Sequence, residues 1–410
     1  MSPAADHGEI EQLTLELLDR YEEINLLYDI GQALAGVFDV DAIGRAVVDR
    51  AMAVIHAEAG LFLLVEGETA RVAYRAGDVP APLLAGLTPG ADLLRRALAA
   101  PVLIMQPLLA VRVQHGATPF GVLALAGKRD TSAFTASDGR LLQALAEQAA
   151  TAIRTEHLVR ELRESERIRS EMEIARQLQR SLLPQSSPRI LGVDVAATCQ
   201  PSGHVGGDYF DFFSLPDGRF GVVIADVSGH GVSSAIVMAG LRSTIHAEVQ
   251  SGFDPAQVFR RANTLLARDF AASGMFVSAF LAVYEPATGE LAYTNAGHPP
   301  PYLLAAPSDE AERLEAGGLL LGVVADAAYE TGKARLDPGA VLVLYTDGLT
   351  EARAPNGEFF GEAALARVVR EGHALSATGL HSTVLGAAST HLGGREPDDD
   401  VTLIVVSRRG

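Results

Sequence analysis

Four short acidic stretches in the second half of the chain have the composition of a divalent-cation site. They occupy residues 206–211, 225–231, 345–348 and 398–402, and each adjoins an apolar run that predicts a β-strand. Carboxylates at strand ends can converge on hard cations such as Mg²⁺ and Mn²⁺, which take oxygen ligands and often keep some of their waters. The pattern therefore predicts an oxygen-lined metal site.

Size and charge restrict the classes of function. A chain of 410 residues is too long for one hydrophobic core, so two or three domains are expected. Hydrophobic residues make up 48% and charged residues 20%, which is typical of a globular protein. The formal net charge of -18 argues against nucleic acid or an anionic membrane surface as the main partner, because both attract clustered Lys and Arg.

The single cysteine and the hydropathy pattern indicate a cytoplasmic protein. Cys199 alone excludes an internal disulfide and a Cys-ligated zinc site. Residues 1–9 are polar and lack the apolar core of a signal peptide. Residues 101–111 are too few to span a bilayer, and His56 and Glu58 interrupt residues 51–65, so no membrane contact is predicted.

Periodicity divides the chain into four segments. Residues 1–21 predict an N-terminal amphipathic helix, in which Ile10, Leu13 and Leu17 recur at helical spacing. Residues 22–156 predict a compact α+β domain. It has helices at 38–55 and 137–162, a hairpin of 59–65 with 70–74, and strands at 101–113 and 119–126.

A charged helix is predicted over residues 157–184, where Pro184 ends it. One of its faces is apolar and is expected to form a coiled-coil linker; that face contains Ile168, Met172, Ala175, Leu178 and Leu182. The second domain, residues 185–410, alternates strands and helices. Strands are expected at 221–224, 276–284, 290–295, 340–345 and 401–406, and helices at 233–249 and 256–269.

From about residue 170 the chain resembles the SpoIIE/RsbU-type phosphatases, a branch of the PPM superfamily related to protein phosphatase 2C. The resemblance begins at residues 175–184, Ala-Arg-Gln-Leu-Gln-Arg-Ser-Leu-Leu-Pro. It continues in family order through the acidic stretches and the Asn-Ala-Gly-His-Pro-Pro segment at 295–300. It implies a β-sandwich flanked by helices on both faces, with two Mn²⁺ or Mg²⁺ ions at one end between the sheets.

The family pattern, transferred position by position, makes Asp226 the carboxylate that bridges both ions. Asp208 and the backbone carbonyl of Val227 would complete one ion's protein ligands, and Asp347 and Asp399 would bind the other. A water activated by the ions would attack phosphorus in line, without a phosphoenzyme intermediate. Asp399 is chosen over its neighbours Asp398 and Asp400 from the Asp-Asp-x-Thr register.

Three further residues near these ligands have open roles. Asp211 is either a ligand or a residue that orients one, and Asp400 is an orienting candidate. His230 either holds the loop or approaches the phosphate. His298 is expected to hold residues 295–300 by hydrogen bonds. Basic residues are absent from the motifs, so the ions would do most of the phosphate binding.

Residues 22–156 resemble a GAF domain through their entry at 23–31 and their exit at 120–125. Lys128, Phe134 and Asp138 match the signature of cyclic-nucleotide-binding members, but Gly127 and Gly139 replace its Asn and Glu. This departure argues against cyclic-nucleotide binding. The domain either binds an unknown small ligand or serves as a dimerisation and signal-transmitting module without one.

Together these resemblances imply a Mn²⁺- or Mg²⁺-dependent serine/threonine phosphatase regulated by its GAF domain and linker. Its substrate would be a phosphorylated STAS-domain protein, an anti-sigma-factor antagonist in a partner-switching pathway. The GAF and linker helices are expected to form a homodimer. The alternative is a pseudophosphatase scaffold that binds a signalling partner without turnover; loss of a ligand would favour it, and all the expected aspartates are present.

Overall fold

The computed structural model describes residues 28–409, apart from residues 29, 35, 38, 68, 204, 230, 253, 271–273 and 306–310. The helix expected over residues 1–21 lies outside the described residues. The chain forms two compact units, one up to Arg167 and one from Ile168 onward. Among the described helices, none combines the length and apolarity that a membrane span needs.

The first unit is built on one antiparallel sheet with the strand order β2-β1-β5-β4-β3. One face of the sheet packs against α2 and the first part of α5, and the other face packs against α4. The described elements are α2 (Val40–Ile55), β1 (Ala57–Glu66), β2 (Thr69–Ala76), α3 (Ala81–Gly86), α4 (Asp92–Ala99), β3 (Val102–Met105), β4 (Leu108–His115) and β5 (Thr118–Lys128).

This unit confirms the predicted hairpin of β1 with β2. Residues 101–113 form two strands and not one, because the chain turns back at Gln106 and Pro107 between β3 and β4. The short helices α3 and α4 were not predicted. They lie between β2 and β3.

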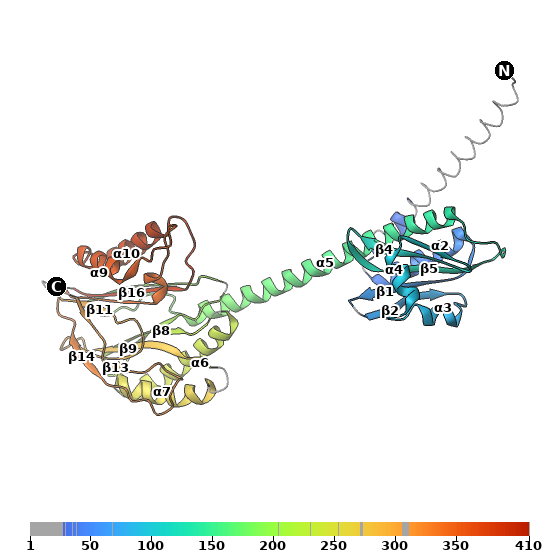
Figure 1. The fold of residues 1–410 in the computed structure, drawn as a ribbon. Helices are drawn as coiled ribbons and strands as arrows, with labels where there is room; N and C mark the ends of the chain where they lie inside the picture. Colours follow the sequence, from blue (N-terminus) through green and yellow to red (C-terminus); the bar gives the residue numbers. More distant parts are fainter. Residues whose placement is uncertain are drawn as a thin grey trace, which may run out of the picture. The chain divides into compact units, whose positions relative to one another are not determined.

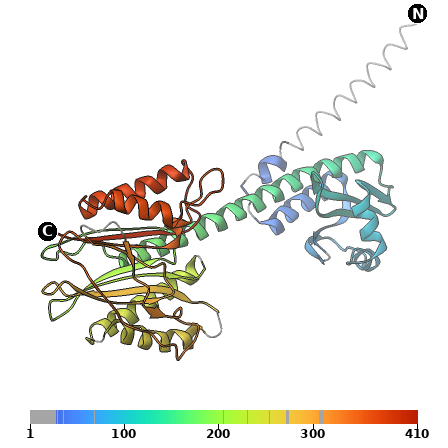
Figure 2. The same ribbon diagram turned by 60° about the vertical axis from the view of Figure 1, so that its left-hand side comes forward.

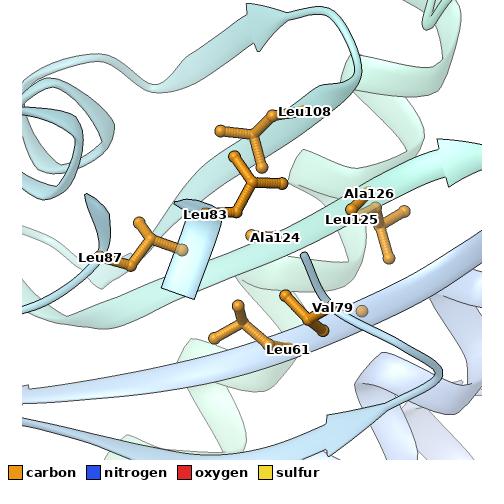
Figure 3. Close-up of a pocket in the computed structure, with 9 residues that line it drawn as sticks. Leu61, Val79, Leu83, Leu87, Leu108, Ala124, Leu125 and Ala126 are labelled. Atoms are coloured by element: carbon orange, nitrogen blue, oxygen red, sulfur yellow. The ribbon is translucent and has the colours of Figure 1, made fainter. Parts of the chain in front are cut away.

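A small apolar pocket lies between the sheet and the segment around α3. Figure 3 shows its lining, in which all the side chains drawn consist of carbon alone, including those of Leu61, Val79, Leu83, Leu87 and Leu108. It leaves almost no space that a water-sized molecule could enter. Such a lining offers no side-chain donor or acceptor to a phosphate or a base.

The helix α5 (Ala136–Leu182) runs without a break for 47 residues. It thus joins two predicted stretches, residues 137–162 and 157–184, into one. Near its start, Lys128 of β5 forms an ion pair of 2.8 Å with Asp138, and both side chains are largely buried. The backbone N–H of Thr135 also donates to Asp138 over 2.7 Å. Two residues of the GAF signature therefore fasten the first turn of α5 to the sheet.

The second unit stacks two sheets face to face between two pairs of helices (Figures 1 and 2). One sheet has the order β13-β10-β9-β8-β7, with β14 paired to β10, and the other has the order β12-β11-β15-β16-β6. The first sheet comprises β7 (Tyr209–Ser214), β8 (Phe220–Val227), β9 (Val277–Tyr284), β10 (Glu290–Ala296), β13 (Gly317–Gly318) and β14 (Gly332–Arg335). The second comprises β6 (Val193–Gln200), β11 (Tyr302–Leu304), β12 (Ala311–Arg313), β15 (Val341–Tyr345) and β16 (Val401–Arg408).

Helices cover the outer face of each sheet. The helices α6 (Val232–Val249) and α7 (Pro255–Phe270) pack on the sheet that contains β8, whereas α9 (Gly361–Glu371) and α10 (Ala377–Leu392) pack on the sheet that contains β16. The single turn α8 (Asp347–Thr350) follows β15 directly. This is the expected β-sandwich with helices on both faces.

Side chains that alternate along each strand form two kinds of core, one between the two sheets and one between a sheet and its helices. Val222 and Ile224 of β8 face the opposite sheet, while Val223 and Ala225 face the helices. A strand's side chains alternate between its faces. Asp226, next in the first series, therefore projects toward the space between the sheets at the end of β8.

Candidate functional site

The acidic stretches meet at one end of the sandwich. Asp226 is the next-to-last residue of β8 and pairs with Ser278 of β9. Asp347 begins α8 directly after β15, and Asp399 precedes β16. Asp208 precedes β7 and is buried. The fold thus brings together, from four separate strand ends, the four aspartates that the sequence predicted as ligands.

Crowding of negative charge dominates the electrostatics of this end. Burial, together with the charges of Asp347, Asp399 and Asp400, raises the pKa of Asp226 to about 7. Burial, followed by the charge of Asp226, raises the pKa of Asp208 well above its usual range. Burial and then Glu351 also raise the pKa of Asp347. Like charges held close in a poorly solvated place disfavour ionisation, and a bound cation would relieve this repulsion.

Two threonines from the opposite sheet hold the Asp208 carboxylate. The hydroxyl of Thr346 donates to its Oδ2 over 2.8 Å, and that of Thr402 donates to the same atom over 2.6 Å. Thr346 also accepts from the backbone N–H of Thr402 over 2.9 Å. Both threonines are buried. Both threonines belong to the acidic stretches 345–348 and 398–402, but no role was predicted for them. The signal that could have identified them is a hydroxyl residue next to the predicted aspartate ligands.

Asp400 anchors the loop that carries Asp208. Its Oδ2 accepts from the N–H of Gly207 over 2.6 Å, and its Oδ1 accepts from the N–H of Ser202 over 2.8 Å. Asp400 itself is buried, whereas Asp399 is exposed and accepts from the Asp400 N–H over 2.8 Å. Asp400 thus holds the backbone of the loop, while the charge of Asp399 acts on Asp226.

The remaining candidates lie apart from this cluster. Asp211 faces α6, where its Oδ2 lies 2.6 Å from His246 Nε2 and 3.4 Å from Arg242 Nε. It lies among the helix-facing residues of β7, since its neighbours Tyr209 and Phe213 belong to that core. Asp398 is exposed and lies 3.7 Å from Arg353. His230 lies outside the described residues.

His298 is buried next to Ser278, the residue of β9 that pairs with Asp226. Its Nδ1 lies 2.9 Å from the hydroxyl of Ser278, and its backbone N–H donates to the side chain of Asn295 over 2.8 Å. Burial lowers the pKa of His298 to about 3, so the ring is neutral near pH 7. It holds residues 295–298 to β9, in keeping with the structural role expected for it.

Gly207 leaves an open cradle between the ligand candidates. A Cβ atom built there would lie 2.6 Å from the carbonyl oxygen of Val227 and 3.3 Å from Asp226 Oδ1. Only glycine leaves this space free. Within the described residues, no three His, Cys, Asp or Glu side chains are arranged to hold a metal ion by themselves. The donor set nevertheless suits Mg²⁺ or Mn²⁺, because it consists of crowded carboxylates and a backbone oxygen around this cradle.

Comparisons with known proteins identify relatives of both units. Residues 216–409 match the family described as stage II sporulation protein E (SpoIIE), and residues 39–155 match the GAF domain family. The chain is 31% identical over 242 residues to phosphoserine phosphatase RsbU of Bacillus subtilis (strain 168), covering 59% of this chain and 71% of that protein. The chain belongs to the SpoIIE/RsbU family of protein serine/threonine phosphatases.

Two further relatives of this SpoIIE/RsbU protein extend the comparison. Protein IcfG of Synechocystis sp. (strain ATCC 27184 / PCC 6803 / Kazusa) is 29% identical over 266 residues, which cover 58% of this chain and 42% of IcfG. The solved SiaA-PP2C domain of Pseudomonas aeruginosa superposes with a TM-score of 0.54 at 22% identity, covering 60% of this chain and 99% of that domain. This likeness shows the fold of the second unit and confirms the expected β-sandwich with helices on both faces.

Proposed function

We propose that this protein hydrolyses a phosphoserine or phosphothreonine monoester with the help of two divalent cations, Mn²⁺ or Mg²⁺. The observation that carries the proposal is the convergence of Asp208, Asp226, Asp347 and Asp399 at one end of the sandwich in a SpoIIE/RsbU family member. Such a cluster raises its own pKa values unless a cation is bound.

In this proposal Asp226 is shared by both cations. Asp208 and the Val227 carbonyl complete the protein ligands on one side, and Asp347 and Asp399 complete those on the other. When bound, the cations would neutralise the phosphate dianion and supply an activated water as the nucleophile. The cradle at Gly207, next to the Asp226 carboxylate and the Val227 carbonyl, supports this assignment.

The chain's other residues position these ligands. Thr346 and Thr402 fix the Asp208 carboxylate, which directs its second oxygen away from their hydroxyls. Asp400 holds the Gly207 backbone beside Asp226. Outer partners of this kind commonly change metal affinity by about 10- to 100-fold when they are removed.

The substrate is proposed to be a phosphorylated STAS-domain protein in a partner-switching pathway. Family membership and the name phosphoserine phosphatase carried by RsbU support a phosphoprotein substrate.

Regulation is proposed to pass from the GAF domain through α5 in a homodimer. Five large apolar side chains on α5 are exposed in the single chain: Leu158, Leu162, Ile168, Ile174 and Leu178. Pairing with a second copy would bury them. The apolar face predicted from sequence is only partly free, because Leu182 packs on the core beneath α6 and α7.

Phosphate release from a phosphorylated STAS protein tests the proposal directly. Release should stop in a chelator and return when Mn²⁺ is added. Full turnover in excess chelator would overturn the two-cation mechanism. Binding of the phosphorylated partner without phosphate release, at saturating Mn²⁺, would instead favour the pseudophosphatase scaffold.

A further inference from the structure

The last turns of α5 reach the loop that carries Asp208 through one side chain. Gln179 is 7% exposed, although most of its neighbours on the helix lie in solvent. Its Oε1 accepts from the N–H of Gly206 over 3.1 Å, and its Nε2 donates to the carbonyl oxygen of Gly206 over 2.7 Å. The amide thus satisfies both polar groups of one buried residue's backbone.

The loop is held between Gln179 on one side and Asp400 on the other. A Cβ at Gly206 would lie 2.1 Å from Asp400 Oδ2, so the backbone packs directly against that carboxylate. The next residue, Gly207, donates to Asp400 and accepts from the N–H of Val227 over 3.4 Å. Gln179 therefore holds the residue that leads into both the cradle and Asp208.

Glutamine suits position 179 because its amide both donates and accepts at the right distance from the helix. Few other side chains do so. Alanine would leave the buried N–H and C=O of Gly206 without partners, and unsatisfied buried polar groups destabilise the segment that contains them. Asparagine is one methylene shorter and could not span the same gap. Glutamate would keep the acceptor, but it would set a carboxylate against the Gly206 carbonyl and add negative charge beside Asp400.

We propose that Gln179 is a positioning residue for the metal centre, and that the end of α5 is in this way a structural part of the site. The inference rests on the proposed function. Leu182 and Leu183 pack the same end of the helix against the sandwich cores. A displacement of α5 by one residue, a rise of about 1.5 Å, would break both hydrogen bonds between Gln179 and Gly206. The state of the linker would thus set the position of Asp208.

The test compares Gln179→Ala and Gln179→Glu with Gln177→Ala and Gln177→Glu in the full-length chain. Gln177 is the matched control, because it is an exposed glutamine on the same helix whose side chain donates to Glu173, one turn earlier. Calorimetric titration with Mn²⁺, without substrate, gives the metal affinity. Hydrolysis of p-nitrophenyl phosphate across a range of Mn²⁺ concentrations gives kcat and the Mn²⁺ requirement.

Both Gln179 variants should bind Mn²⁺ about tenfold or more weakly. Their kcat should recover toward the wild-type value at high Mn²⁺, while the Gln177 variants match the wild type. In metal-free protein, hydrogen exchange of the segment that contains Gly206 should be faster only in the Gln179 variants. Should Gln179→Ala fail to fold, Gln179→Glu, which keeps one of the two bonds, decides.

Failure of the role proposed for Gln179 can be distinguished from failure of the proposed function. Gln179 variants that match the Gln177 variants in Mn²⁺ affinity and exchange, in a protein that binds Mn²⁺ and turns over, overturn the role of Gln179 alone. A wild-type protein that neither binds Mn²⁺ nor releases phosphate overturns the proposed function, and the inference with it.

Discussion

The hydroxyl of Thr402 donates a 2.6 Å hydrogen bond to Asp208, although 194 residues separate the two in the chain. Thr402 belongs to β16 and Asp208 precedes β7, so the bond crosses from one sheet to the other. It joins the first and last acidic stretches into one site. The carboxylate orientation that a cation would meet is therefore fixed by residues that are not ligands.

Replacing Thr402 by valine should weaken metal binding while leaving the fold intact. Valine keeps the shape of the side chain but removes the donor, so Asp208 Oδ2 retains only Thr346. Mn²⁺ affinity should fall by about tenfold or more, as measured by calorimetric titration. Thr402→Ser, which restores the hydroxyl, should return most of the affinity. An unchanged affinity in Thr402→Val would show that the bond does not orient Asp208 for the metal.

The acidic run at residues 398–400 should divide into three different roles. Asp399→Asn should abolish turnover, because it removes a proposed ligand. Asp398→Asn should leave turnover largely intact, since Asp398 is exposed and lies 3.7 Å from the exposed Arg353. Asp400→Asn should loosen the loop at residues 202–207, which hydrogen exchange would detect. Equal turnover in the Asp398 and Asp399 variants would mean that the register is misassigned.

Asp226→Asn should separate activity from stability. The pKa of Asp226 is raised to about 7 from an ordinary value of 3.8, with burial as the main cause. A raised pKa in the folded state means that folding favours the protonated form. The stability that this provides is complete below about pH 4 and is lost as the pH rises through about 7.

The metal-free variant should therefore unfold at a higher temperature than the metal-free wild type near pH 8, and the two should converge as the pH falls to about 4. Turnover by the variant should be abolished at every pH. Thermal unfolding in chelator, monitored by circular dichroism, gives the comparison, and Asp398→Asn is the control. A variant that is less stable than the wild type at pH 8 contradicts the crowded, repulsive cluster described here.

Sequence identified the ligand candidates because each lies in a short motif beside an apolar strand. It could not identify the residues that position these ligands. Gln179, for example, binds the backbone N–H and C=O of Gly206, and every residue type except proline carries both of these groups. Asp211 was open as a ligand because it shares a motif with Asp208. A strand's period of two already separates residues three apart onto opposite faces, and the structure turns Asp211 toward α6.

The fold was predictable to a similar degree. Strands with long apolar runs, such as β9 and β16, were expected at nearly their observed bounds. The helix α10 was not expected, because its sequence is rich in Gly, Ser and Thr, which have weak helix propensity. Its buried Leu380 and Val384 pack on the sheet, so tertiary contacts outweigh local preference there.

Cys199 should react slowly with thiol reagents in the folded protein. It is a partly buried residue of β6, and burial raises the pKa of its thiol to about 12, with the charge of Asp208 adding to the effect. The thiolate, which is the reactive form, is therefore scarce near pH 8. Reaction with Ellman's reagent should be slow in native protein and rapid after unfolding in guanidinium. Rapid labelling of native protein would show that the thiol is not held in its protonated form.

A proline at Ser170 should uncouple the two units without destroying the metal centre. Ser170 lies in the exposed middle of α5, where proline removes a backbone hydrogen bond and costs about 3 kcal/mol. The break lies before Gln179, Leu182 and Leu183, whose contacts with the sandwich would survive. The variant should thus still bind Mn²⁺ but lose the homodimer that the exposed apolar residues of α5 are proposed to form.

Light scattering and Mn²⁺ titration measure both properties, and Ser170→Ala, which is compatible with a helix, is the control. Turnover of the phosphorylated substrate should then differ between Ser170→Pro and Ser170→Ala, because only the continuous helix can transmit the state of the first unit to the loop at Gly206. If the wild type is monomeric and Ser170→Pro matches it in turnover, α5 is only a tether between the units.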